Sequence, residues 1–389
     1  MKILFVAMSD SIHTARWISQ IVDQSWNIYL FPSIQGVHLH PIISNFTDDD
    51  KIQVKSGISY DKLKNSLKMK IHYNYNKLKR TFLKNSSAKE LVKFIKKTKP
   101  DLIHSLEIQH AGYLTLEAKK IYKGTFPHWA VSNWGSDIFL FGRLNNHKER
   151  IKQVLENSDY YLCECTRDTI LAKDFGFKGS ILPIIPNAGG YELSSLSKFR
   201  QSGKTSQRRL IMLKGYQGIF GRGQVALRAL ELCADLLQNY EIVIYSASND
   251  MKVSAELFTK STGISVKIIS RGTDHIEILR LYGQARISIG LSISDGISTS
   301  LLEALVMGSF PIQSKTSCCD EWIENGKNGF IVPPEDPNIV ESAIRTALKD
   351  DQLVDSAAEI NNKITTERLD YSKLKSKVIN TYKIIGNHF

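Results

Sequence analysis

The sequence predicts an α/β protein made of two doubly wound, Rossmann-like domains, each a parallel sheet covered by helices on both faces. Short apolar runs alternate with helical patterns from end to end, and this strand–helix alternation occurs twice. The chain has 389 residues, of which 42% are hydrophobic, enough for two cores of ordinary size. Folds of this kind bind ligands at the carboxyl ends of their strands, so we expect the two domains to face a central cleft.

The expected strands are apolar runs of three to five residues. In the first half they are 3–7, 28–31, 102–105, 129–132, 160–163 and 181–184. In the second half they are 210–213, 242–245, 266–269, 287–291, 310–313 and 330–332. Apolar residues three and four apart predict helices between them, as over 225–237, 276–282 and 339–348.

Turn residues and polar composition set the domain boundaries. The N-terminal domain is expected over 1–190, because the sequence NAGG ends it at 187–190. The polar stretch 194–209 predicts an exposed linker over 191–209. The second domain follows over 210–366. Residues 367–389 contain a last helix, at about 371–385, that could pack on either domain.

A formal net charge of +12 is concentrated in one segment, 51–100, where fifteen Lys and Arg residues face only Asp61 and Glu90. Apolar residues recur through it at helical intervals. The pattern suits an anionic membrane surface, and a solvated helical face explains it equally well. Nucleic acid is not the expected partner, because no recognised binding module accompanies the charge.

The sequence does not indicate a secreted, membrane-spanning, disulfide-rich or metal-binding protein. The opening apolar run is too short for a signal peptide or a membrane span, and no run of about 18 apolar residues occurs elsewhere. Five cysteines without a C-x-x-C pair fit neither a disulfide framework nor a zinc site, so we expect a reducing, cytoplasmic location. The acidic triplet 48–50 is interpreted as a solvated turn, and no metal or other cofactor is expected.

The most informative stretch, 287–332, reads as strand, loop, helix and strand. Asp295 and Gly296 close the loop, and the sequence STS at 298–300 opens the helix. Ser300 and Glu303 have the spacing of a capping box. Gly308 is placed to end the helix in the left-handed conformation before the next strand.

This helix start has the chemistry of an anion site. Free backbone N–H groups and the positive end of the helix dipole attract a phosphate, and the hydroxyls of Ser298, Thr299 and Ser300 add donors. Gly296 allows a ligand close to the backbone. Asp295 and Glu303 flank the site, where one can contact a sugar and the other a ribose. The plain alternative is an ordinary strand–helix unit with a capping box.

The same residues carry a family resemblance. Asp295-x7-Glu303, followed by ALVMG at 304–308 and FPI at 310–312, resembles the Glu-x7-Glu signature of the GT-B glycosyltransferases, specifically the large retaining family 4. The match continues through Asn328-Gly329-Phe330 to the prolines at 333–334. Asp295 departs from the usual Glu, and its shorter side chain changes the reach to the sugar.

The resemblance extends to the donor phosphates. Lys214-Gly215 and Arg222-Gly223 correspond to a region where the family holds two cations that neutralise the diphosphate. Their order is swapped here, but either residue supplies the charge that a leaving diphosphate needs. Arg271 corresponds to the place where the family holds the nucleotide base. Two surface cations near a glycine-rich loop remain the alternative interpretation.

Weaker matches predict the acceptor side. The segment from Ser9 to Trp17 follows the first strand, and its part HTARW, from His13 to Trp17, resembles the first helix of the family's acceptor domain. Trp134-Gly-Ser-Asp137 is similar to a His-Gly-Ser-Asp loop of the family, with Trp134 in place of the histidine, so the role of that histidine is not carried over. Asp137 is expected to face the acceptor or to cap a helix.

Together these features predict a retaining, metal-independent hexosyl- or N-acetylhexosaminyltransferase that uses a nucleotide diphosphate sugar. The expected acceptor is a glycan or lipid-linked glycan of cell-surface polysaccharide synthesis, such as lipopolysaccharide, O-antigen or capsule. The basic segment 51–100 adds the expectation of a peripheral enzyme on the cytoplasmic membrane face. The alternatives are a GT-B nucleotide-sugar epimerase or phosphorylase, and a non-catalytic sugar-nucleotide or polyanion-binding protein.

Overall fold

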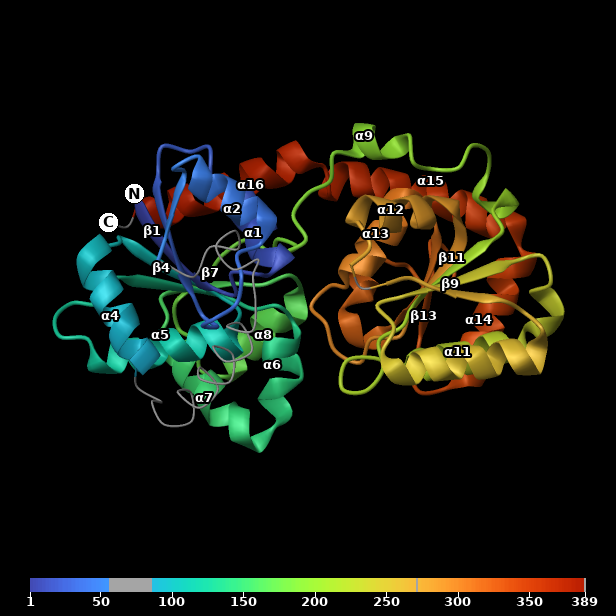
Figure 1. Cartoon of the computed structure of the whole chain (residues 1–389), viewed down its shortest axis with the longest axis horizontal. Coiled ribbons are helices and arrows are strands. Elements are labelled where there is room, and N and C mark those ends of the chain that lie inside the picture. Colours follow the sequence, from blue (N-terminus) through green and yellow to red (C-terminus); the bar gives the residue numbers. More distant parts are fainter. Residues whose placement is uncertain (56–85, 271, 388–389) are drawn as a thin grey trace, which may run out of the picture. The chain divides into compact units, whose positions relative to one another are not determined.

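The computed structural model describes residues 1–55, 86–270 and 272–387. The chain divides into two compact units, one formed by Met1–Gly189 with Lys375–Phe389 and the other by Gly190–Leu374 (Figure 1). Each unit contains one parallel sheet with helices packed on it. The predicted α/β class, with two doubly wound sheets, is confirmed.

The N-terminal unit is built on a sheet of seven parallel strands in the order β3-β2-β1-β4-β5-β6-β7. Its strands are β1 (Lys2–Ala7), β2 (Asn27–Pro32), β3 (Ile52–Val54), β4 (Leu102–Leu106), β5 (His128–Ser132), β6 (Tyr160–Leu162) and β7 (Ser180–Ile181). The central strands β1 and β4 are buried almost throughout, because helices cover both faces of the sheet. This double burial explains why these strands read as continuous apolar runs.

Helices of the N-terminal unit lie on both sides of its sheet. They are α1 (Ile12–Ser19), α2 (Pro41–Asp48), α4 (Ser86–Thr98), α5 (Tyr113–Ile121), α6 (Ser136–Phe139), α7 (Asn145–Glu156) and α8 (Thr166–Asp174). Helices α4, α5 and α7 pack side by side on one face, and α1 lies on the other face together with α16 (Tyr371–Gly386) (Figure 1).

The C-terminal unit has six parallel strands in the order β10-β9-β8-β11-β12-β13. The strands are β8 (Leu210–Lys214), β9 (Glu241–Tyr245), β10 (Val266–Ile268), β11 (Ala285–Gly290), β12 (Phe310–Ser314) and β13 (Phe330–Val332). The helices are α9 (Leu193–Ser197), α10 (Gly223–Leu232), α11 (Asn249–Thr262), α12 (His275–Gln284), α13 (Thr299–Met307), α14 (Pro337–Lys349) and α15 (Asp351–Arg368). Helices α10, α11 and α14 cover one face, and α12, α13 and α15 cover the other (Figure 1).

Each of the twelve expected strands corresponds to a strand of the structure, with ends shifted by up to three residues. Strand β3 was not predicted. It pairs with β2 over three residues at the edge of the sheet, inside the lysine-rich segment. Its sequence, IQV, is too short for a pattern to stand out among the surrounding lysines, so only the edge of an existing sheet makes it a strand.

Most of the stretch predicted as an exposed linker is exposed, but its last residues, from Thr205, pack on the C-terminal unit. Arg208 is only 4% exposed, and its guanidinium donates to the carbonyls of Ala285 and Met307. The amide and hydroxyl of Ser206 both donate to the carboxylate of Asp355 at 2.9 Å. At this end of the stretch, polar side chains satisfy backbone carbonyls and a carboxylate of the unit.

The last helix, α16 (Tyr371–Gly386), belongs to the N-terminal unit from Lys375 onward. Its Tyr382 is buried at the centre of a hydrogen-bonded chain. The indole N–H of Trp17 donates to Tyr382 Oη at 2.8 Å, and His104 Nδ1 lies 2.7 Å from the same oxygen. His104 Nε2 lies 2.8 Å from Ser132 Oγ, so this series of hydrogen bonds joins α1 and α16 to strands β4 and β5. Burial lowers the pKa of His104 to about 3.

In the part of the chain that the structure describes, no helix has both the length and the apolar character needed to cross a bilayer. Most of the lysine-rich segment predicted to meet an anionic surface, residues 56–85, lies outside the described residues.

Candidate functional site

The predicted anion site lies where the chain leaves β11 and enters α13. Helix α13 begins at Thr299, with Ser298 as its N-cap, and no side chain caps it. The backbone amides of Thr299 and Ser300 donate to no described residue, so the first turn keeps open N–H groups. The hydroxyl oxygens of Ser298 and Ser300 are 2.7 Å apart. Open amides and two hydroxyls at one helix start form a donor set for an oxyanion.

The predicted capping box between Ser300 and Glu303 is wrong. Ser300 is the second residue of α13 rather than its N-cap, and Glu303 turns to a neighbouring helix. The helix therefore starts two residues earlier than the capping box requires, which leaves its amides available. The predicted left-handed stop is confirmed, because Gly308 ends α13 with φ 72° and ψ 21°.

Lys214 reaches the same corner from a neighbouring strand. Strands β8 and β11 are paired in parallel, so their carboxyl ends lie at one edge of the sheet. Lys214 ends β8, and its Nζ lies 3.3 Å from Ser298 Oγ. The ammonium also lies over the ring of Tyr216, 4.6 Å from its centroid. The structure thus brings the first predicted cation to the start of α13.

Gly215 has a packing reason for being glycine. A Cβ built there would lie 2.6 Å from Ile244 Cγ2 and 2.9 Å from Ala247 Cα. The turn after β8 therefore passes close to β9, and any side chain would push it away. This closeness fixes the backbone that presents Lys214.

Arg222, the second predicted cation, is engaged elsewhere. Its Nε lies 2.9 Å from each carboxylate oxygen of Glu335, and Nη1 donates to the carbonyls of Gly218 and Gly221. No contact among the described residues joins it to Ser298. The sequence did not single out Glu335, which lies in the turn after the two prolines and is 113 positions away. Only the tertiary structure brings this pair together.

Glu303 has a partner that sequence reasoning missed. Its side chain is 7% exposed, and Oε1 lies 2.6 Å from Nε2 of His275. His275 is the first residue of α12, which starts there because the Asp274 carboxylate accepts from the Ile276 amide at 3.0 Å. A buried carboxylate is costly unless it is hydrogen-bonded, so this contact stabilises Glu303 in place. No motif spacing in the sequence pointed to it.

Two buried tyrosines lie behind the site. Tyr245 and Tyr282 share a hydrogen bond of 2.6 Å between their hydroxyls. Burial raises the pKa of both phenols above the ordinary value, so both stay neutral at physiological pH.

The remaining predicted donor residues that the structure describes are buried or half-buried. Gly296 is buried, Asp295 is half-buried in the loop, and Thr299 is half-buried at the helix start. Arg271 lies outside the described residues.

The predicted acceptor residues gather at the carboxyl edge of the N-terminal sheet. Ser9 follows β1 and is buried, with its hydroxyl unpaired among the described residues. The rings of His13 and Trp134 are in contact, with centroids 5.3 Å apart. Residues from α1 and from the loop after β5 therefore meet here.

Asp137 binds backbone rather than capping its own helix. Its Oδ2 accepts from the Trp134 amide at 3.0 Å and the Ile108 amide at 3.1 Å, while Gly135 is the N-cap of α6. Burial, with a contribution from Glu107, raises the pKa of Asp137 to about 8. The carboxyl ties together the loops that follow β4 and β5.

Glu107 is a third residue that sequence reasoning missed, after Glu335 and His275. It follows β4 directly, is buried, and adopts φ 79°, which is rare for any residue but glycine. Its carboxylate accepts from the amides of His110 and Ala111, at the start of the π-helical turn Ile108–Gly112. No sequence motif identifies Glu107, because its backbone conformation is stabilised by these hydrogen bonds and they become visible only in the structure.

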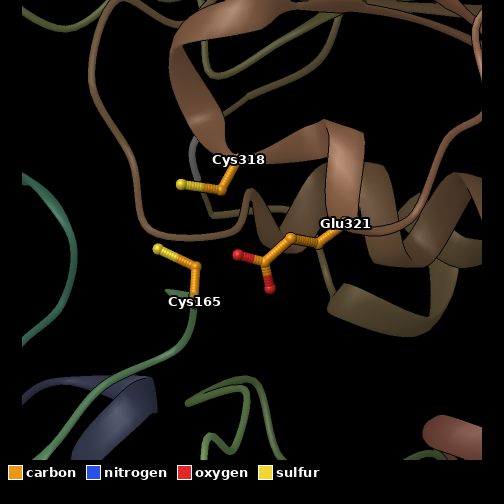
Figure 2. Close-up of side chains that lie close together, drawn as sticks. All are labelled: Cys165, Cys318 and Glu321. Atoms are coloured by element: carbon orange, nitrogen blue, oxygen red, sulfur yellow. The ribbon is translucent and has the colours of Figure 1, made fainter. Parts of the chain in front are cut away.

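All five cysteines are free and buried. Cys318 and Glu321 come from one pair of short turns after β12, where the Glu321 amide donates to the Cys318 carbonyl at 3.2 Å. Figure 2 draws the side chains of Cys318 and Glu321; Cys165, which it also labels, belongs to the other unit and is not counted with them. Cys318 and Glu321 alone supply two ligand atoms, fewer than a protein zinc site uses, so we assign this turn no metal.

Comparison with family models identifies both halves of the chain. Residues 2–164 match the model described as glycosyl transferase 4-like, and residues 222–364 match the model of glycosyl transferases group 1. No curated protein matches the chain by sequence.

Solved structures match over the whole length. Sucrose-phosphate synthase from Thermosynechococcus elongatus has 14% identity and a TM-score of 0.72, with 100% of each chain covered. Anabaena HepE, solved with UDP-glucose, has 15% identity and a TM-score of 0.71, covering 98% of this chain and 99% of the other. A Rickettsia africae glycosyltransferase has 14% identity and a TM-score of 0.67, with 99% and 98% covered. At such identities the structures show the fold, and the two family models account for most of the sequence. The chain therefore belongs to the family-4-like glycosyltransferases of the GT-B fold.

Proposed function

We propose that this glycosyltransferase transfers a sugar from a nucleotide diphosphate donor with retention of configuration and without a metal ion. The observation that carries the proposal is the start of α13, where open amides and two serine hydroxyls meet the ammonium of Lys214. Such a cluster of donors and positive charge suits a diphosphate, whose negative charge grows as it leaves the sugar.

In the proposed donor complex, the diphosphate lies at the amides of Thr299 and Ser300, beside Lys214. Gly296 lets it approach the backbone. Arg222 adds the second positive charge after it exchanges Glu335 for phosphate oxygens. With two side-chain cations and a helix dipole available, the leaving group needs no metal for charge neutralisation.

Glu303 is assigned to the ribose and Asp295 to the transferred sugar, with Arg271 near the base. The resemblance to the retaining family supports these roles. Anabaena HepE was solved with UDP-glucose and shares the fold, which supports a nucleotide sugar as the donor class. The acceptor hydroxyl then attacks on the face from which the diphosphate departs.

We assign the acceptor to the edge of the N-terminal sheet that carries Ser9, His13, Trp134 and Asp137. The proposed reaction is hexosyl or N-acetylhexosaminyl transfer to a glycan or lipid-linked glycan, in the synthesis of lipopolysaccharide, O-antigen or capsule. The lysine-rich segment 51–100 supports a peripheral location on an anionic membrane face in the cytoplasm. A liposome-flotation assay tests that part, and binding that ignores the anionic lipid content would contradict it.

The test is a panel of UDP-, GDP- and ADP-sugars, with nucleoside diphosphate release measured against a range of glycan acceptors. We expect acceptor-dependent release with one donor, and a loss of at least a hundredfold in kcat/KM in the Lys214→Ala/Arg222→Ala double variant, since such charges stabilise the departing group by roughly 3 kcal/mol. Circular dichroism checks that the variant is folded. Full activity in the folded double variant would refute the assignment.

The same assay separates the rival functions. An epimerase would convert the donor sugar without any acceptor. A phosphorylase would carry lysine-bound pyridoxal phosphate, visible by absorbance. A non-catalytic binding protein would bind the donor and release no nucleoside diphosphate with any acceptor.

A further inference from the structure

His275 lies against the carboxylate that the proposed function assigns to the donor ribose. We propose that His275 is a positioning residue that fixes the Glu303 carboxylate for the ribose hydroxyls and so makes the site selective for ribonucleotides. This inference rests on the proposed function and adds to it a residue and a specificity that the motif alone does not contain.

The contact is held by two helices. Glu303 is the fifth residue of α13 and is almost fully buried, whereas His275 opens α12 and is 40% exposed in its side chain. Helices α12 and α13 pack side by side on the same face of the sheet. The distance of 2.6 Å between Nε2 and Oε1 therefore depends on helix packing, not on two flexible surface side chains.

The chemistry of the pair leaves one acceptor free. With a proton on Nε2, the imidazole donates to Oε1 whether the ring is neutral or charged. Oε2 of Glu303 accepts no hydrogen bond from any residue in the described part of the chain. A carboxylate only accepts, and the 2′ and 3′ hydroxyls of a ribose are donors, so Oε2 matches a ribose diol.

Fixing the carboxylate changes binding through pre-organisation. A glutamate side chain that must be ordered by its ligand loses rotamer freedom at that moment, and this cost weakens the complex. His275 orders the carboxylate before the donor arrives. Removing His275 is therefore expected to weaken the binding only of ligands that hydrogen-bond to Glu303.

A purely structural role for His275 predicts something different. If the histidine merely compensates a buried charge, its removal would weaken the fold and affect every ligand of the site to the same extent. A positioning role predicts a penalty that depends on the ribose hydroxyls. Ligands with and without those hydroxyls therefore separate the two roles.

The experiment is isothermal titration calorimetry of the full chain with UDP and with 2′,3′-dideoxy-UDP. For His275→Ala we expect the Kd of UDP to rise about tenfold, or ~1.4 kcal/mol, and the Kd of dideoxy-UDP to change less than twofold. In His275→Gln, a side-chain amide can still donate, so UDP affinity should be partly restored. Ile276→Ala, at the exposed next position of α12, is the matched control and should leave both values unchanged.

Equal weakening of both ligands, or no weakening of UDP, would overturn the positioning role. If wild-type protein prefers GDP or ADP, the same pair of ligands is made with that base. If wild-type protein binds none of the three nucleoside diphosphates, the donor-site assignment itself fails, and that result is distinct from a failure of His275.

Discussion

Two cations of the proposed donor site differ in what surrounds them. Lys214 lies beside Ser298 at the start of α13, ready for an anion. Arg222 is held by both oxygens of Glu335 and by two loop carbonyls. Lys214 is therefore already at the proposed phosphate site, whereas Arg222 must first exchange Glu335 for the phosphate. Replacing Lys214 and replacing Glu335 are expected to have different effects.

Replacing Lys214 by Ala removes the charge already at the helix start. We expect kcat/KM for the donor to fall about a hundredfold or more, because a single group aimed at a developing negative charge stabilises the transition state by roughly 3 kcal/mol. The measurement is initial-rate kinetics of nucleoside diphosphate release. Lys252→Ala, an exposed lysine on α11, is the control, and a loss equal to the control would contradict the assignment.

Replacing Glu335 by Gln should have the opposite effect on binding. Removing the carboxylate frees Arg222 for the diphosphate, and an exposed ion pair of this type contributes about 0.2–1 kcal/mol. We expect the Kd of UDP to fall by up to about fivefold, measured by calorimetry. Glu324→Gln removes a comparable exposed pair with Lys327 and should change nothing. Weaker binding in Glu335→Gln would show that Glu335 orients Arg222 instead of competing for it.

At the scale of elements, α13 is defined at both ends by backbone conformation. Its start keeps open amides because Ser298 makes no side-chain cap, and its end is set by Gly308 in the left-handed region. Strand β12 begins two residues later, so the turn at Gly308 sets the direction of the chain between helix and sheet. The helix start is the proposed phosphate site, whereas the helix end sets the turn into β12.

Gly308→Ala tests the helix end. The nearest atoms to an added Cβ, on Arg208 and Ala358, are 3.6 Å or farther away, so the cost is conformational rather than steric. We expect about 1 kcal/mol of destabilisation in urea unfolding followed by circular dichroism. Gly272→Ala, where φ is not positive and nothing lies within 4 Å, is the control and should cost less. Equal effects of the two variants would contradict the role of Gly308.

At the scale of the whole molecule, the C-terminal segment of the chain, from Lys375, belongs to the N-terminal unit. Helix α16 places Tyr382 between Trp17 and His104, so the last residues complete the N-terminal core. The two units are thus connected twice by the chain, once after Gly189 and once before Lys375.

The buried His104 predicts acid sensitivity of the N-terminal unit. Its pKa is about 3 in the folded protein against an ordinary value of 6.5 for histidine, so the unfolded chain binds the proton first. Stability is therefore full above pH 6.5 and falls as the pH drops toward 3. Between pH 7 and pH 5 we expect a loss of about 2 kcal/mol from this group.

The measurement is urea unfolding at pH 7, 6 and 5, followed by tryptophan fluorescence, because four of the five tryptophans lie in this unit. His104→Gln, which does not titrate, should lose less stability than wild type over the same range, whatever its starting stability. Parallel pH profiles for the two proteins would show that His104 does not cause the sensitivity.

Much of the fold was predictable because buried parallel strands carry continuous apolar runs that sequence inspection finds. Strand β3 was not found, since its three residues become a strand only by pairing with β2. The burial of the last residues of the linker was not predicted, because a polar side chain such as Arg208 can be buried when it satisfies carbonyls.

The sequence by itself determined the local parts of the site: the helix start at 298–300, the stop at Gly308, and the lysine that ends β8. These depend on neighbouring residues, and local conformation follows from local sequence. The tertiary structure alone decided that His275 holds Glu303, that Glu335 holds Arg222, and that α16 completes the N-terminal core. Each of these contacts joins residues 28 to 365 positions apart, and only the packing of helices and strands brings such residues together.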